Sequence, residues 1–465
     1  MSAPVKPIQI LVEESHHIPI VEIVIGTRGG AASDPVGREG ALNLAFRSLR
    51  RGAGKRGATA IEEEIDRLGA VFGTSVDVNG TIIQARVIKR NLDRFLPLLA
   101  DLVLRPTFPA AEVGQLIREM RSDIVAARND DRGLAARAFR RALFAGNPKG
   151  RPVNGTLDTL DTLDRDIAEN AYRRQLVRGN VMIGVSGDVD PRDITARLND
   201  ALGGIPAGES AAIEPIEPAR PKGRHLLVVD KPDRTQTQIY IGMIGGDPYD
   251  PDYVALDVAN TVFGGTFTAR LMQEVRSKRG WSYGASSRLG LDRGREGWTM
   301  HTFPAATDAA ACLSLQLSML DELLDRGISS KELDFAKRYI AGSHAFEVDT
   351  AVKRLSQRLE AALLPTPKGY FEKYVEHVKS VTLDQANRAL RKRLSKDDLL
   401  VTIVATAKDL RADLEKAIPR LASTHVMPFD TDLIRREPLF PMSGAAETVK
   451  LRAARGRRVS HASDS

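Results

Sequence analysis

The sequence contains a single cysteine, Cys312, among its 465 residues. One thiol forms no intrachain disulfide and cannot build a zinc ribbon or finger, so disulfide-stapled and zinc-stapled small folds are excluded. Long apolar runs are also missing, and the longest, such as VEIVIG and LLVTIVAT, have the length of a strand. Because a helix that crosses a bilayer needs about 20 apolar residues, the sequence predicts no membrane span.

Aromatic residues are scarce, at 5% of the chain, although the formal net charge is +7. The basic residues concentrate in FRSLRRGAGKR and in KLRAARGRR near the C-terminus, and they are not interleaved with aromatic side chains as in a base-stacking platform. Single-stranded nucleic acid is normally held by aromatic stacking within a basic groove. We therefore interpret the charge as a solvated basic face and expect no nucleic-acid partner.

Several chemical signatures are absent as well. There is no phosphate-binding loop and no dinucleotide fingerprint. GVSGD (Gly184–Asp188) fails as a nucleophile elbow, because Asp188 stands where the second glycine is required. None of the eight histidines has a second histidine four residues away, the spacing of a helical zinc site, and HAFE (His344–Glu347) is half of an H-x-x-E-H motif. The sequence predicts no cofactor and no metal bound by this chain.

What the chain does contain is an internal repeat. IVIGTRGG (Ile23–Gly30) and IYIGMIGG (Ile239–Gly246) are alternating segments that end in a glycine pair, 216 residues apart. Two further similar segments begin at Thr162 and Thr382, 220 residues apart. Because the offset hardly changes along the chain, we interpret the sequence as two copies of one domain of roughly 200 residues.

The repeat and the composition predict four segments. These are an N-terminal domain over 1–205, a linker rich in proline, alanine and charge over 206–222, a C-terminal domain over 223–423, and an extended or disordered tail over 424–465. Alternating strands among amphipathic helices predict the α+β class, with two homologous domains, each a mostly antiparallel sheet with helices packed on one face.

Helices are marked by their apolar spacing and by their first residues. GALNLAFRSLRRG (Gly40–Gly52) is predicted as one helix, because its apolar residues recur at i, i+3, i+4 and i+7. Capping boxes, in which the first residue and the residue three positions later bond each other's backbone N–H groups, are predicted at Thr59–Glu62, Ser329–Glu332 and Thr382–Gln385.

From about Ile8 to Leu421 the chain resembles the pitrilysin and mitochondrial processing peptidase family of zinc endopeptidases, the inverzincin group with H-x-x-E-H on a helix. The segments that carry the resemblance are IVIGTRGGAASDPVGREGALNLAFRSLRRGA, IEEEIDRLGAVFGTSV, GNVMIGVSGDVD and FGGTFTARLMQEVRSKRGWSYGASS. The resemblance implies two homologous α+β domains, in agreement with the repeat.

The first half departs from the family at its catalytic motif. Asn43 and Arg47 stand where the family has its two zinc-binding histidines, and Phe46 stands where it has the glutamate that activates water. A guanidinium offers no lone pair to zinc and a phenyl ring takes no proton. The later helix keeps acids at Glu119 and Asp123, where the family supplies its third ligand, but one carboxylate alone holds no zinc.

The second half matches the family better. The family's arginine and tyrosine, seven residues apart, fall at Arg276 and Tyr283. The resemblance implies that this pair contacts the peptide at the zinc, with the phenol stabilising the developing oxyanion and the guanidinium holding peptide carbonyls. Taken alone, the two residues are better explained as a helix-surface arginine and a strand tyrosine. Arg279 is a weaker candidate because it lies off the matching position.

A glycine pair, Gly264 and Gly265, precedes this segment. It is interpreted either as a loop that lines the substrate side, as the resemblance suggests, or as an ordinary helix end followed by a turn.

Together these observations predict the non-catalytic subunit of a heterodimeric zinc metallopeptidase for peptide or protein degradation or processing. Arg276 and Tyr283 would then serve a homologous partner that carries H-x-x-E-H and zinc, with a peptide or unfolded protein as substrate. The alternative is a structural or scaffolding member without a role in proteolysis, like the core proteins of respiratory complexes. Because bacterial two-subunit members of the family are often exported, we expect a periplasmic location with the leader absent from this sequence. The cytoplasm is the alternative.

Overall fold

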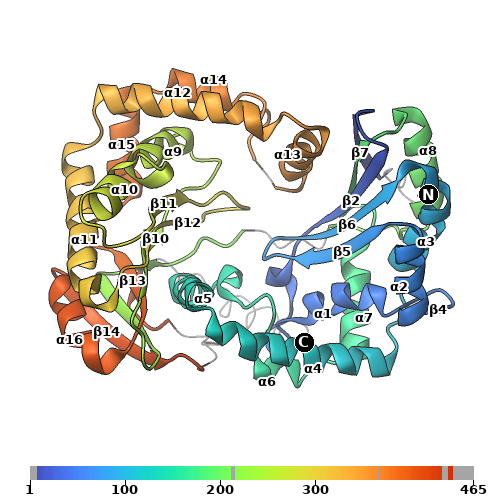
Figure 1. Ribbon diagram of the computed structural model, residues 1–465, viewed down its shortest axis with the longest axis horizontal. Helices are drawn as coiled ribbons and strands as arrows, with labels where there is room; N and C mark the ends of the chain where they lie inside the picture. The colour runs from blue at the N-terminus through green and yellow to red at the C-terminus, as the bar shows by residue number, and fades with distance from the viewer. Residues whose placement is uncertain (1–7, 211–214, 365, 432–437, 444–465) are drawn as a thin grey trace, which may run out of the picture. The chain divides into compact units, whose positions relative to one another are not determined.

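The computed structural model of the protein describes residues 8–210, 215–364, 366–431 and 438–443. The described chain forms two compact units, each built around its own sheet (Figure 1). Neither unit is one continuous stretch of sequence. The first combines Met1–Ala126, Arg151–Glu214 and Ala341–Tyr374, and the second combines Ala127–Gly150, Pro215–Ile340 and Val375–Ser465.

The first sheet has five strands. In spatial order they are β1 (Gln9–Glu14), β7 (Val181–Gly187), β2 (Ile20–Arg28), β6 (Gly80–Ile88) and β5 (Val71–Val76). β1 and β7 are parallel, and the other neighbours are antiparallel. Side chains alternate between the faces, so Val21, Ile23 and Ile25 of β2 enter the large apolar core on one side.

Helices cover this core face of the first sheet. Each one contributes buried apolar residues to this core, and α1, α2, α3 and α8 contact the strands directly, whereas α4, α6 and α7 pack mainly on other helices. They are α1 (Ala41–Arg47), α2 (Ala58–Arg67), α3 (Leu92–Leu104), α4 (Ala110–Ala126), α6 (Leu157–Leu160), α7 (Arg165–Gln175) and α8 (Pro191–Leu202). The helix predicted over Gly40–Gly52 is shorter than expected, because α1 ends at Arg47 and the chain continues as a 3-10 turn over Ser48–Arg50.

The second sheet repeats the strand order of the first. In spatial order its strands are β11 (Ala285–Leu289), β12 (Gly297–Thr302), β10 (Gln238–Ile244), β13 (Leu399–Ala405), β9 (Arg224–Asp230) and β14 (Leu421–Pro428). The run from β11 to β9 corresponds to the run from β5 to β1, and β14 is an additional edge strand. The α+β class and the two homologous domains are therefore confirmed.

One helix of each half packs on the sheet of the other half. α5 (Asp131–Leu143) packs on β10 and β13 of the second sheet, whereas α13 (Ala351–Leu363) packs on β7, β1 and β2 of the first. The two helices begin 220 residues apart, so the exchange follows the sequence repeat. Both contacts use a glycine. A Cβ at Gly26 would meet Leu363 of α13 at 2.6 Å, and one at Gly242 would meet Phe139 of α5 at 2.9 Å.

This exchange affects how the sheets are covered and how the chain divides into compact units. Each sheet has helices on both faces rather than one, as the continuous burial along β13 requires. The compact units also divide the chain differently from the predicted domains 1–205 and 223–423, because 127–150 belongs to the second unit and 341–374 to the first. The physical reason is that the strands β7 and β13 are buried along almost their whole length, so both of their faces must be removed from water.

The remaining helices lie mostly in the second unit. They are α9 (Tyr253–Asn260), α10 (Arg270–Met272), α11 (Ala309–Arg326), α12 (Ser330–Glu347), α14 (Tyr374–Ser380), α15 (Leu383–Arg393) and α16 (Ala407–Ala417). Two short π-helical turns, η6 (Thr261–Gly265) and η7 (Gln273–Ser277), flank α10.

Two of the three predicted capping boxes are confirmed. Thr382 and Gln385 bond each other's backbone N–H groups at the start of α15, and Ser329 and Glu332 do so before α12. The box at Thr59 is wrong. α2 begins at Ala58, two residues earlier than a cap at Thr59 requires, its cap residue Gly57 has no side chain to bond, and Glu62 pairs with Arg50 instead.

The linker and the tail are also partly ordered. Residues Arg220–Pro221 (β8) of the predicted linker pair with Met442–Ser443 (β15), and β14 extends the second domain to Pro428, beyond the predicted boundary at 423. Residues 444–465 of the predicted tail lie outside the described residues. Within the described chain, no helix is both long and apolar enough to cross a membrane.

Candidate functional site

The start of α1 is held by a buried carboxylate. Gly40 has φ +95°, which favours glycine, and Asp34 accepts hydrogen bonds from the backbone N–H groups of Gly40 and Leu42, each at 3.0 Å. Burial raises the pKa of Asp34 to about 7, and Glu39 adds to the rise, although the two N–H donors and Arg174 oppose it. The charge at this helix start is therefore sensitive to pH in the physiological range.

Phe46 is a core residue of the first unit. It is buried, and its ring centroid lies 5.4 Å from that of Tyr172 in an edge-on contact. The Tyr172 hydroxyl donates to the carbonyl of Val103 at 2.7 Å, which fixes the ring against α3. At the position of the family's general base, the chain thus has an apolar contact that stabilises the fold.

Arg47 and Asn43 make polar contacts instead of holding a metal. Nη1 of Arg47 donates to Oδ2 of Asp123 at 2.8 Å, and Nδ2 of Asn43 donates to Oδ1 of Asn154 at 2.6 Å. Glu119, at the position of the third ligand, accepts from Nη2 of Arg51 at 2.8 Å. The acids of α4 are therefore neutralised by arginines that precede them in the sequence.

These residues do not fit a zinc ion. Two arginines already neutralise the carboxylates, and neither Phe46 nor Arg47 has a lone pair to donate. Over the described ranges, no three histidine, cysteine or acidic side chains gather in a way that could hold a metal ion. We therefore derive no chemical step through a metal on this chain.

Arg276 and Tyr283 lie together in the second unit. The guanidinium carbon of Arg276 lies 4.2 Å from the ring centroid of Tyr283 and 4.6 Å from that of Phe267. Both rings are open to solvent, with 76% of Tyr283 and 65% of Phe267 exposed. Such cation–π contacts hold a guanidinium without neutralising its charge.

Local structure explains how the pair is positioned. Arg276 lies in the π-helical turn η7, next to Val275, which is buried in the core. Tyr283 lies in the turn before β11, two residues before the strand begins, so the strand tyrosine of the sequence interpretation is not observed. The neighbouring Ser282 is buried, donates to the carbonyl of Gly284 at 2.7 Å, and accepts from the N–H of Phe303 at 3.0 Å.

Nearby arginines differ from Arg276 in having acidic partners. Arg279 pairs with Glu274 at 2.6 Å, and Arg270 forms a two-point ion pair with Glu332, with both N–O distances at 2.7 Å. Among the described residues, no carboxylate is found within ion-pair distance of Arg276. Arg279 is therefore occupied in the fold, and Arg276 keeps its planar donors for another group.

Gly264 and Gly265 are the last two residues of a helical turn. They close the π-helical turn η6 and do not form a loop. Gly264 is buried, and a Cβ there would lie 2.3 Å from the backbone nitrogen of Ser287, so glycine allows η6 to approach the edge strand β11. Gly265 is exposed, beside Thr261. Neither glycine contacts Arg276 or Tyr283 through any described interaction.

A cavity of about 740 Å³ lies beside the segment that carries Arg276. Its walls come from η6, η7, α11 and α12, and they include Val262, Gln273, Met319 and Phe335. Arg276 and Tyr283 do not line it. The charged groups Arg270 and Glu332 in its wall are bound to each other.

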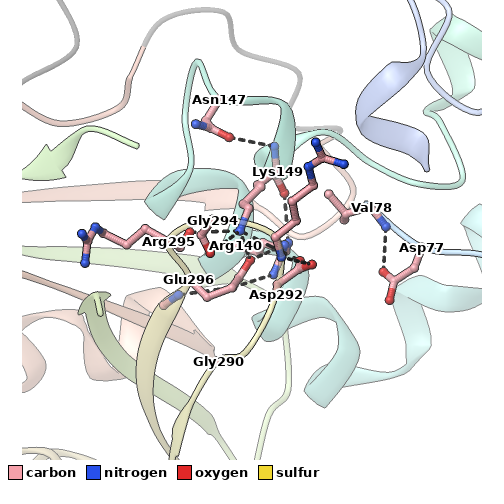
Figure 2. Close-up of polar contacts among 12 residues, drawn as sticks. Asp77, Val78, Arg140, Asn147, Lys149, Gly290, Asp292, Gly294, Arg295 and Glu296 are labelled. Carbon is pink, nitrogen blue, oxygen red and sulfur yellow. Dashed lines mark hydrogen bonds and ion pairs between the residues drawn. The ribbon is translucent and has the colours of Figure 1, made fainter. Parts of the chain in front are cut away.

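A buried charge cluster anchors the hairpin that follows Tyr283 (Figure 2). Nζ of Lys149 donates to Oε1 of Glu296 at 3.1 Å and to the carbonyl of Arg295 at 3.0 Å, and Nη2 of Arg140 donates to the same carboxylate at 3.0 Å. Burial raises the pKa of Glu296, but Arg140 and Lys149 lower it further, so the net pKa is below its ordinary value. Because these charges are neutralised within the unit, we assign the cluster to stability.

Sequence reasoning missed Phe267. The only signal was an aromatic residue in TFTARL, directly after the glycine pair, where the pattern predicts no core position. Its contact with Arg276 depends on the turn between η6 and α10, which no periodicity specifies.

Comparison with known proteins matches both halves of the chain. Residues 9–157 match the family described as Insulinase (Peptidase family M16), and residues 162–340 match the Peptidase M16 inactive domain. The second match contains Arg276 and Tyr283.

Individual relatives cover most of the chain. The non-peptidase homolog YmxG of Helicobacter pylori is 21% identical over 86% of this chain and 92% of its own length. An uncharacterized zinc protease of Streptomyces coelicolor is 26% identical over 82% and 84%. Among solved structures, a peptidase M16 inactive domain from Pseudomonas fluorescens has a TM-score of 0.78 at 25% identity, covering 85% of this chain and 94% of its own.

Proposed function

This chain belongs to the M16 peptidase family, and we propose that it is a non-catalytic subunit that lends Arg276 and Tyr283 to a homologous partner bearing H-x-x-E-H and zinc. The observation that carries the proposal is the free charge of Arg276. Its guanidinium contacts two exposed rings and has no acidic partner among the described residues, unlike Arg270 and Arg279 beside it. Exposed cation–π contacts of this kind contribute only about 0.5–1 kcal/mol to stability.

The two side chains suit peptide hydrolysis. Attack on a peptide carbonyl builds negative charge on its oxygen, and a phenol that donates to this oxygen stabilises the transition state. The planar fork of a guanidinium holds peptide carbonyls in a defined direction. In the proposed complex, the partner's zinc would activate the attacking water, and this chain would bind and orient the peptide.

The substituted residues at the family's zinc-binding motif also support a non-catalytic role for this chain. Phe46 and Arg47 are integrated into packing and ion pairs, so the helix remains without metal chemistry. The description of the matched domain as inactive and the name of the Helicobacter relative fit a chain that cleaves nothing by itself. As part of the proposal, we place the complex in the periplasm, which fractionation of the native host would test.

Reconstitution tests the proposal. The chain is purified alone and together with a homologous H-x-x-E-H chain from the same genome, and cleavage of quenched-fluorescent peptides is measured. We expect activity only in the mixture and a large loss with Arg276→Ala or Tyr283→Phe while the complex still assembles. Arg279→Ala is the matched control, because Arg279 is already paired with Glu274. Unchanged activity in both variants would instead support the scaffolding function.

A further inference from the structure

The loop between η6 and α10 exposes an aromatic side chain that the fold does not use. Phe267 is 65% exposed, whereas Thr266 and Ala269 on either side of it are buried and fix the loop. The ring interaction described for Phe267 is its contact with Arg276 at 4.6 Å. An apolar residue so open to water contributes little to the core, so the contact with Arg276 is the interaction through which Phe267 acts in the fold.

Phe267 shares its contact with Arg276 with a second ring, that of Tyr283. The guanidinium of Arg276 contacts both rings, at 4.6 Å and 4.2 Å, and the two rings come from segments on either side of η7. A long arginine side chain has many conformers in water, and contacts with two rings restrict them. A guanidinium that stacks on the face of a ring keeps its in-plane N–H donors available for other acceptors.

We propose that Phe267 is a positioning residue, which together with Tyr283 holds the Arg276 guanidinium in one orientation and directs its free donors toward carbonyl oxygens of a bound peptide. The peptide role rests on the proposed function. The positioning itself rests only on the three-residue contact.

The chain offers a matched comparison for this contact. Arg279 also contacts an aromatic ring, that of Trp281 at 5.4 Å, but it is additionally tied to Glu274. Removing Trp281 therefore leaves Arg279 held by an ion pair, whereas removing Phe267 leaves Arg276 with one ring. Both changes remove one aromatic residue from the same surface segment.

The first experiment uses this chain alone. The full chain and its variants react with phenylglyoxal, and modification of each arginine is followed by mass spectrometry of peptides. We expect Phe267→Leu to raise the rate at Arg276 about threefold or more, Phe267→Tyr to restore the original rate, and Trp281→Leu to leave Arg276 unchanged. An unchanged rate in Phe267→Leu, with the thermal unfolding midpoint preserved, would overturn the positioning.

The second experiment uses the reconstituted peptidase. Phe267→Leu is expected to raise KM about fivefold with a smaller effect on kcat, Phe267→Tyr to rescue KM, and Trp281→Leu to have no effect. An equal KM in Phe267→Leu and the original chain would refute the peptide role. If no partner yields activity, the proposed function fails, and the phenylglyoxal rates still decide whether Phe267 positions Arg276.

Discussion

Nη1 of Arg47 lies 2.8 Å from Oδ2 of Asp123, so the helix that carries histidines in active M16 peptidases here carries a cation bound to α4. Phe46, one residue earlier, is buried against Tyr172. The helix has therefore been retained by packing, with polar contacts at its surface in place of a metal.

Packing should matter far more than the ion pair for the stability of the first unit. Phe46→Ala is expected to lower the free energy of unfolding by about 3–5 kcal/mol, because it leaves a cavity in a dense core. Arg47→Ala should cost at most about 1 kcal/mol, because the pair with Asp123 is partly exposed to water. Urea unfolding followed by circular dichroism measures both, and a larger cost for Arg47→Ala would contradict this view.

Arginine at position 276 should not be replaceable by lysine. In the reconstituted peptidase, Arg276→Lys keeps the charge but loses the planar fork, so kcat/KM should fall at least about tenfold.

Tyr283→Phe removes the only phenolic donor of the pair and should lower kcat by roughly 10²–10³, as for loss of an oxyanion donor. Because both side chains lie at the surface, the unfolding midpoints should not change. A loss of activity that parallels a loss of stability would argue for a structural role.

Asp34 should make stability fall as the pH rises. Burial raises its pKa to about 7 from the ordinary 3.8, so the folded chain keeps a proton that the unfolded chain releases. This contribution is fully present below pH 3.8 and is lost as the pH rises through 7. Relative to Asp34→Asn, the free energy of unfolding should decrease by up to about 4 kcal/mol across that interval. If the difference in free energy of unfolding between the original chain and Asp34→Asn stays constant or grows with pH, the two N–H donors determine the pKa of Asp34 more strongly than burial does.

Removing Glu296 should destabilise the second unit strongly. Glu296→Ala leaves the buried ammonium of Lys149 without its carboxylate partner at 3.1 Å and with only the more distant Asp292, at 4.0 Å, which costs about 3 kcal/mol. Glu217→Ala is the control, because Glu217 is largely exposed and its partner Arg295 keeps a second carboxylate, that of Asp250, so the loss is expected to be about 1 kcal/mol or less. Equal effects of the two substitutions in denaturant unfolding would contradict the assignment of the cluster to stability.

Weakening the packing of the exchanged helix α5 should change the unfolding of the second unit, which tryptophan fluorescence reports. Both tryptophans, Trp281 and Trp298, belong to that unit, and Trp298 is buried on β12. Phe139→Ala in α5 should lower the midpoint of the tryptophan fluorescence transition, with a cost of about 3–5 kcal/mol. Leu355→Ala in α13 should shift this transition less, because α13 packs on the first sheet. Equal shifts would contradict the assignment of α5 to the second unit.

The sequence predicted the features that depend on local pattern and on repetition. The alternating strands at Ile23 and Ile239 occupy equivalent central positions, and the loss of metal ligands at Asn43, Phe46 and Arg47 required only the chemistry of these side chains. The cap of α15 was also predictable from the sequence, because Thr382 and Gln385 bond each other's backbone N–H groups within one turn.

The features that depend on contacts distant in sequence were not predictable. Nothing in the periodicity of α5 states which sheet its apolar face covers, so the division of the chain into compact units could not be read from it. The partners of Arg47 on α4 and the ring of Phe267 beside Arg276 likewise require the folded arrangement. The setting of Gly264 follows from a backbone approach to β11 that no spacing rule describes.

The exchange of α5 and α13 has a consequence for synthesis. The ribosome completes α5 at Leu143, but the strands that bury its apolar face, β10 and β13, end only at Ile244 and Ala405. Until most of the chain has been made, this helix has no surface to cover and stays open to chaperones and proteases. A chain truncated before β13 therefore leaves the apolar face of α5 exposed, and this exposed face can mark the incomplete chain for degradation.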